Sequence, residues 1–124
     1  MQRITCKTLR SVGSIYTAGV HTKELGGSQL ILDPCTNQGT AFSISARQHL
    51  GLHGLFPPKV STQEEQLERC WFNFNKLEDP MSKYKFLREL RNRNEKLYYK
   101  MLLSDLKQLM PIVYTPTVGE ACLQ

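Results

Sequence analysis

Residues 110–122 read MPIVYTPTVGEAC and place Tyr114 between two prolines. Proline fixes its own φ angle and pushes the residue before it out of helical geometry. We therefore expect Met110 and Thr115 to be extended, and the preceding helix to end before Pro111. A tyrosine on a stiff extended segment is either a core side chain at the end of a strand or a proton donor held against a substrate. These residues taken alone favour the core side chain.

Upstream of this stretch, helical periodicity dominates and predicts a mainly α fold with short extended connectors. Ser43 is a suitable N-cap for a short helix that ends near Gly51. Thr62 and Glu65 have the spacing of a capping box, which predicts a helix through about Phe74.

Further helix signals follow toward the C-terminus. Asp79 and Pro80 predict the next helix start, and the pattern leaves open whether one helix follows or two that break near residues 92–94. Ser104 or Asp105 can cap a further helix, and Thr117 can cap another that begins at Val118. By contrast, residues 30–34 read LILDP and are expected to be extended.

Composition limits the classes of function. The chain has 124 residues and a formal net charge of +5, enough for one domain. The positive charges precede Glu24 or mix with acids between Lys83 and Lys107, with no basic stripe that interleaves aromatic residues, so nucleic-acid binding is not expected. No apolar run reaches the length of a membrane span, and no membrane partner is expected.

The cysteines and histidines do not suggest a metal site. None of the four cysteines lies within four residues of another, which excludes a zinc-ligand pair and suits a reducing compartment: Cys6, Cys35, Cys70 and Cys122. His49 and His53 are four residues apart, but nearby glycines at 51 and 54 make a regular helix there unfavourable.

Residues 1–20 read MQRITCKTLRSVGSIYTAGV, with three basic residues, no acid and several Ser and Thr. This composition is typical of a mitochondrial transit peptide, and the alternative is a disordered basic tail. We expect targeting to the mitochondrial matrix.

Two arginines could hold an anionic ligand. Arg93 would share a helix face with Lys96 and could offer a bidentate fork to a carboxylate, although a surface salt-bridge pattern explains the same residues. Arg69, on the polar side of the helix that follows Thr62, is equally ambiguous. The sequence contains no GxGxxG motif and no P-loop.

Four segments taken in order resemble malic enzymes, the decarboxylating malate dehydrogenases. They read TNQGTAF (36–42), LGLHGLFPP (50–58), RNEKLYY (93–99) and MPIVYTPTVGEAC (110–122). The resemblance covers about residues 21–124 without an obvious gap. Its beginning, residues 21–24 and 30–37, looks most like the mitochondrial NAD-dependent animal type.

The resemblance implies a reaction and a role for Tyr114. In this family L-malate is oxidised and decarboxylated to pyruvate and CO2 with NAD or NADP and Mg2+ or Mn2+, and a tyrosine in the position of Tyr114 protonates the enolpyruvate carbon. The lysine base, the metal carboxylates and the dinucleotide-binding domain would all lie beyond residue 124. Residues 21–124 are thus expected to be an incomplete N-terminal helical domain, a fragment or truncated isoform without activity, cofactor or metal of its own.

The same resemblance assigns Arg69 and Arg93 to a fumarate-binding allosteric site at a dimer interface. Members that respond to fumarate carry a glutamate where this chain has Ser61. Because the family uses this region in contacts between the subunits of a homo-oligomer, the alternative function is a non-catalytic interaction module that associates with full-length subunits.

Overall fold

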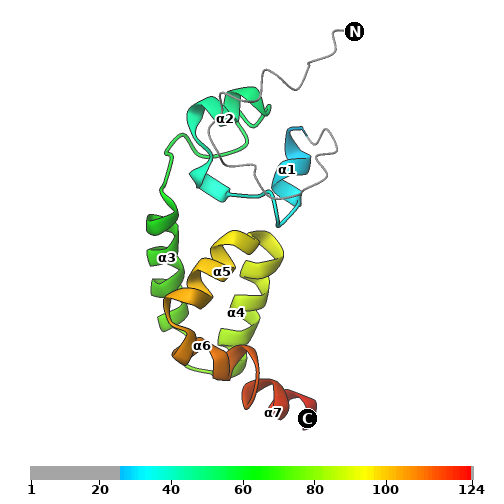
Figure 1. Cartoon of the computed structure of the whole chain (residues 1–124), viewed down its shortest axis with the longest axis vertical. Coiled ribbons are helices and arrows are strands. Elements are labelled where there is room, and N and C mark those ends of the chain that lie inside the picture. The colour runs from blue at the N-terminus through cyan, green and yellow to red at the C-terminus, as the bar shows by residue number, and fades with distance from the viewer. Residues whose placement is uncertain (1–25, 124) are drawn as a thin grey trace.

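Helices form almost all the regular structure of residues 26–123, which are the residues described by this computed structural model (Figure 1). They are α1 (Ser28–Leu32), η2 (Gly39–Ala41, a 3-10 turn), α2 (Ile44–His49), α3 (Gln63–Asn75), α4 (Pro80–Arg93), α5 (Glu95–Ser104), α6 (Leu106–Val113) and α7 (Thr117–Leu123). This part of the chain contains no strand, and the predicted mainly α class is confirmed.

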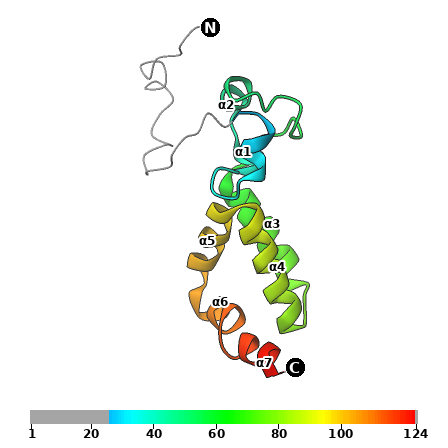
Figure 2. The same cartoon turned by 90° about the vertical axis from the view of Figure 1, so that its right-hand side faces the viewer.

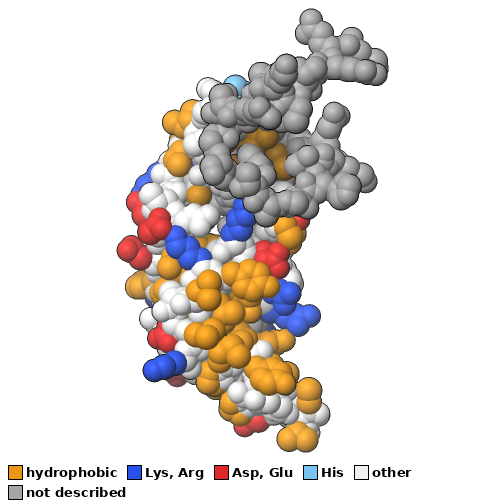
Figure 3. Space-filling view, in the orientation of Figure 1, with side chains coloured by type: hydrophobic (Ala, Val, Ile, Leu, Met, Phe, Trp, Pro, Cys, Tyr) orange, Lys and Arg blue, Asp and Glu red, His pale blue; other side chains and the backbone are white. Residues whose placement is uncertain are grey.

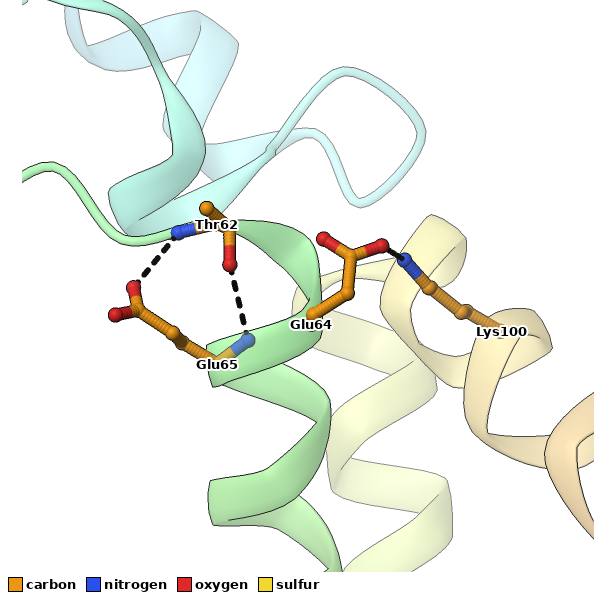
Figure 4. A network of polar contacts seen from close by, with 4 residues as sticks. All are labelled: Thr62, Glu64, Glu65 and Lys100. Atoms are coloured by element: carbon orange, nitrogen blue, oxygen red, sulfur yellow. Dashed lines mark hydrogen bonds and ion pairs between the residues drawn. The ribbon is translucent and has the colours of Figure 1, made fainter.

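Side-chain caps fix where the longer helices begin, as the sequence predicts. The Ser43 hydroxyl accepts a hydrogen bond from the Ala46 N–H at the start of α2. At the start of α3, Thr62 and Glu65 form a complete capping box, in which each side chain accepts the other residue's N–H at 3.1 and 2.9 Å (Figure 4). The Asp79 carboxylate caps α4 by accepting the Ser82 N–H at 2.8 Å.

Asn94 separates α4 from α5 and so decides the question that the sequence leaves open. Its N–H donates to the Leu90 carbonyl at the end of α4, and its side-chain oxygen accepts the Leu97 N–H at the start of α5. Its extended φ and ψ angles of −150° and 91° turn the chain between the two helices. Arg93 ends α4 and Lys96 lies in α5, so the expectation that they share one helix face is wrong.

The proline-rich stretch is also different from the prediction. Helix α6 continues through Pro111, so Met110 is helical and not extended. Burial explains why the proline is tolerated: Leu109 is fully buried, and Ile112 and Val113 pack against the same core, which offsets the hydrogen bond that Pro111 cannot donate. Tyr114 is the C-cap of α6, so the proposed stiff extended segment is not present.

The predicted extended segment at residues 30–34 is largely helical as well. Gly27, at φ +58°, begins α1 in a conformation that favours glycine. Leu30 then faces a small core with Phe42 and Leu52. Burial of Leu30 on this core outweighs the extended preference expected of LILDP.

The helices form two packed units (Figures 1 and 2). Helix α5 packs against both α3 and α4, while α6 and α7 lie at the end of this bundle where α4 begins. The bundle has its own core, made of Cys70, Phe74, Leu87, Leu90, Leu97, Tyr98, Met101 and Leu109. The smaller unit, α1 to α2, lies at the other end, where α3 begins and α4 ends.

The expected transit peptide at residues 1–20 lies outside the described residues. Within the part that is described, no helix has the length and apolar character needed to cross a membrane.

Candidate functional site

An open pocket of about 440 Å³ lies where the connector after α1 meets α3, α4 and α5. Its lining combines polar and apolar side chains: Ile31, Asn37, Gly39, Thr40, Phe56, Gln66, Arg69, Cys70, Asn73, Phe86, Arg93, Asn94 and Leu97. Both arginines that the sequence singles out are therefore on one pocket.

The two guanidiniums are not neutralised within the described structure. Arg69 and Arg93 are exposed, and neither forms an ion pair or side-chain hydrogen bond with any residue between 26 and 123. Two cations without a carboxylate partner make this pocket attractive for an anion.

The positive charges of Arg69 and Arg93 both affect the pKa of the Cys70 thiol. Burial raises its pKa, while the positive charges of Arg93 and Arg69 oppose that shift because they favour the thiolate. Both guanidiniums thus act electrostatically on one point in the pocket wall.

Asn37 holds the pocket together, a role that its sequence position does not reveal. Its side-chain amide donates to the carbonyls of Ile31 in α1 and Arg93 in α4, at 2.9 and 3.0 Å. Its side-chain oxygen accepts the Gly39 N–H at 2.7 Å. Gly39 has φ +58°, a conformation that favours glycine, so any other side chain at this turn would strain the backbone.

Ser61 lies beside the pocket and supplies no carboxylate to it. The residue is buried, and its N–H donates to the carbonyl of Thr40, a lining residue, at 3.1 Å. Its hydroxyl carries no charge and therefore does not replace the glutamate that fumarate-responsive members of the family carry at this position.

Arg47 is a second structural residue that the sequence did not single out. Its guanidinium is buried and donates to four backbone carbonyls, those of Thr40, Phe42, Pro57 and Lys59. It also lies 5.4 Å from the ring centroid of Phe56. Arg47 thereby fixes the loop that brings Phe56 to the pocket.

Tyr114 lies far from this pocket, at the α6–α7 junction at the other end of the bundle (Figures 1 and 2). Its side chain is 65% exposed, so it is not the core side chain that the isolated motif favours. Its N–H donates to the Met110 carbonyl and its carbonyl accepts the Val118 N–H, which ties the tyrosine to both helices. The Thr115–Pro116 peptide bond that follows is cis.

Groups of three or more His, Cys, Asp or Glu side chains placed to hold a metal are absent from residues 26–123. His49 and His53 lie on the exposed α2 end and the loop after it. The described residues do not fit a divalent metal.

Comparison with known proteins shows that this chain is similar to part of the malic enzymes. Residues 91–124 match the family described as malic enzyme, N-terminal domain. The chain is 47% identical over 104 residues to the NADP-dependent malic enzyme of Mus musculus, 46% identical over 104 residues to that of Homo sapiens, and 47% identical over 96 residues to the hydrogenosomal malic enzyme of Neocallimastix frontalis.

These alignments cover 77–84% of this chain but only 16–18% of each relative. The names of these three relatives specify NADP or the hydrogenosome, not a mitochondrial NAD-dependent type.

Proposed function

We propose that this chain is the N-terminal segment of a malic enzyme, an oxidoreductase that converts L-malate to pyruvate and CO2 with reduction of NAD or NADP. The observation that carries the proposal is identity of 46–47% with malic enzymes over at least three quarters of the chain. The dinucleotide and a divalent metal would supply hydride acceptance and charge stabilisation in the whole enzyme.

Tyr114 is the residue of this chain that we assign to the chemistry, as the proton donor to enolpyruvate. A tyrosine hydroxyl keeps its proton at neutral pH and can deliver it to a carbon within reach. The exposed side chain leaves room for a substrate, and the backbone hydrogen bonds to Met110 and Val118 hold its position.

A graft tests this proposal. Residues 21–124 would replace the matching segment of the mouse NADP-dependent malic enzyme, and NADPH formation from malate would be recorded at 340 nm. We expect activity in the graft and none when the segment is deleted. An inactive graft that is folded and assembled like its parent would contradict the proposal. We expect no malate oxidation by the 124-residue chain alone.

The pocket supports a second assignment, in which Arg69 and Arg93 bind fumarate as an activator. A planar guanidinium pairs well with a carboxylate, and one dicarboxylate could engage both arginines. Because this chain has Ser61 where fumarate-responsive members have a glutamate, it lacks the carboxylate that helps position these arginines. We therefore expect weaker activation than in those members. In the graft, fumarate should lower the KM for malate, and Arg69→Gln should abolish this effect, whereas Arg88→Gln outside the pocket should not.

The type and location of the enzyme remain part of the proposal. Residues 21–24 and 30–37 favour a mitochondrial NAD-dependent type. Fusing residues 1–20 to a fluorescent protein tests targeting directly: mitochondrial import supports the proposal, and a diffuse signal contradicts it.

One surface favours the alternative, an interaction module that binds full-length malic enzyme subunits. Tyr99 and Leu103 are exposed one turn apart on α5, and Leu106 and Met110 are exposed one turn apart on α6. Figure 3 shows apolar side chains gathered over this part of the bundle. An apolar surface of this kind is typical of a subunit contact.

Co-purification with the full-length enzyme would test the alternative. Leu103→Glu should abolish capture because Leu103 is 76% exposed on this surface, whereas Leu32→Glu, on an equally exposed residue of α1, should not. Trp71 and Leu97 are unsuitable for this test because both pack in the core of the bundle. Equal capture of both variants and the parent would exclude the α5–α6 surface.

A further inference from the structure

The pocket contains a nucleophile that the proposed function does not use. The thiol of Cys70 lines the pocket from α3, one residue after Arg69, and Arg93 approaches from the end of α4. The residue is only 8% exposed, so reagents reach its sulfur through the pocket.

A second observation indicates that the pocket is built to take a ligand. Asn94 is 4% exposed and lines the pocket. Its side-chain oxygen is used to cap α5, but its amide nitrogen donates to no described residue. The amide N–H group of Asn94 and the two guanidiniums together suit a small anion with oxygen acceptors.

We propose that this pocket makes Cys70 a site of covalent modification by small electrophiles that bear a carboxylate. The guanidiniums of Arg69 and Arg93 would hold the carboxylate and so concentrate the electrophilic carbon beside the sulfur. This inference holds whether or not the arginine pair binds fumarate.

The chemistry is ordinary thiol alkylation. The thiol first loses its proton to water or buffer. With a 2-halo acid, the sulfur forms a bond to the carbon that bears the halogen, and halide leaves with the bonding electron pair. With an α,β-unsaturated acid, the sulfur adds to the β carbon, the π bond breaks, and the α carbon takes a proton from water.

Comparison of two reagents tests the proposal on the 124-residue chain. Iodoacetate and iodoacetamide react by the same displacement but differ in charge, so the ratio of their rates at one cysteine cancels that cysteine's thiolate fraction. The ratio would be measured at Cys70 and at the exposed Cys122 by mass spectrometry of the peptides.

We expect the ratio at Cys70 to exceed that at Cys122 by at least threefold. Arg69→Gln and Arg93→Gln should each reduce the ratio at Cys70 severalfold, because an attraction between charges within a Debye length is lost. Arg69→Lys should retain most of it, and Arg88→Gln, outside the pocket, should leave it unchanged.

Unfolding provides an internal control. In concentrated urea the ratio at Cys70 should fall to that at Cys122, because the pocket no longer exists. Equal ratios in the folded chain, no effect of removing either arginine, or no reaction of folded Cys70 with either reagent would each overturn the proposal.

Discussion

Replacing Asn37 should weaken both the fold and the pocket, because this buried side chain joins the two packed units. Its amide bonds α1 to the end of α4, and its oxygen fixes the Gly39 turn. Asn37→Ala removes three hydrogen bonds of 2.7–3.0 Å at a residue that is 4% exposed. With a net contribution of about 1 kcal/mol for each bond, the expected loss is about 3 kcal/mol.

Asn37→Asp keeps the size of the side chain but removes the two hydrogen bonds that its amide nitrogen donates, so this variant separates the two effects of Asn37→Ala. The aspartate retains the acceptor for the Gly39 N–H but turns a carboxylate oxygen toward the carbonyls of Ile31 and Arg93, where two donated bonds existed. We therefore expect Asn37→Asp to cost at least as much as Asn37→Ala at pH 7. Because the charged form is disfavoured there, the pKa of the new carboxyl should be raised, and the variant should regain stability as the pH falls toward 4.

Urea unfolding followed by circular dichroism and by the fluorescence of Trp71, the single tryptophan, measures these losses. Trp71 reports on the bundle because its indole N–H donates to the Ser104 hydroxyl and its ring contacts Phe74. A 3 kcal/mol loss should lower the urea midpoint by about 1 to 3 M. Asn92→Ala, at an exposed asparagine of α4, is the matched control and should change stability by less than about 0.5 kcal/mol.

A loss below about 0.5 kcal/mol for Asn37→Ala would refute this role. So would an Asn37→Asp variant that is clearly more stable at pH 7 than the alanine variant.

Three further changes test other parts of the structure by the same urea assay or by thermal unfolding. Arg47→Leu should cost about 3 kcal/mol or more, since the Phe42 and Pro57 carbonyls each lose a charge-assisted hydrogen bond; a loss under 1 kcal/mol would be inconsistent with this. Thr62→Ala should cost about 1 kcal/mol by opening the capping box at α3, and an unchanged midpoint would contradict it. Hydrogen bonds from Ser82 lower the pKa of Asp79, so the charged carboxylate stabilises the fold above about pH 4 and this stabilisation is lost as the pH falls through the lowered pKa. The difference in melting temperature between wild type and Asp79→Ala should therefore shrink below pH 4. A constant difference would argue against the cap.

Local signals predicted the starts of α2, α3 and α4 correctly because capping depends on residues three positions apart, whereas Thr117, expected to cap a helix from Val118, lies inside α7. The Thr62–Glu65 box and the Asp79 cap involve neighbours in sequence and have the expected geometry. The Ser43 cap follows the same rule.

Tertiary packing decided the segments that were predicted wrongly. Pro111 should end a helix by its local chemistry, but burial of Leu109 extends α6 through it. Residues 30–34 look extended in isolation, yet residues 30–32 are helical and Leu30 packs with Phe42 and Leu52.

The pocket could be predicted only in part. The resemblance assigned Arg69 and Arg93 to one site, and both line one pocket, but the residues alone did not show that they would meet. Asn37 bonds to Arg93, 56 positions away, and Arg47 bonds to Pro57, ten positions away, so neither role leaves a local pattern.

The assignment of Tyr114 as the proton donor can be tested by hydrogen exchange at the methyl group of pyruvate. In the graft of residues 21–124 into the mouse enzyme, exchange of the pyruvate methyl hydrogens with D2O would be followed by NMR, because the reverse of enolpyruvate protonation releases a methyl proton. We expect Tyr114→Phe to lower this exchange by at least about 100-fold, within the range for loss of a general acid. Tyr99→Phe, at an exposed tyrosine of α5, should leave the exchange unchanged. Undiminished exchange in a folded Tyr114→Phe graft would show that Tyr114 is not the proton donor.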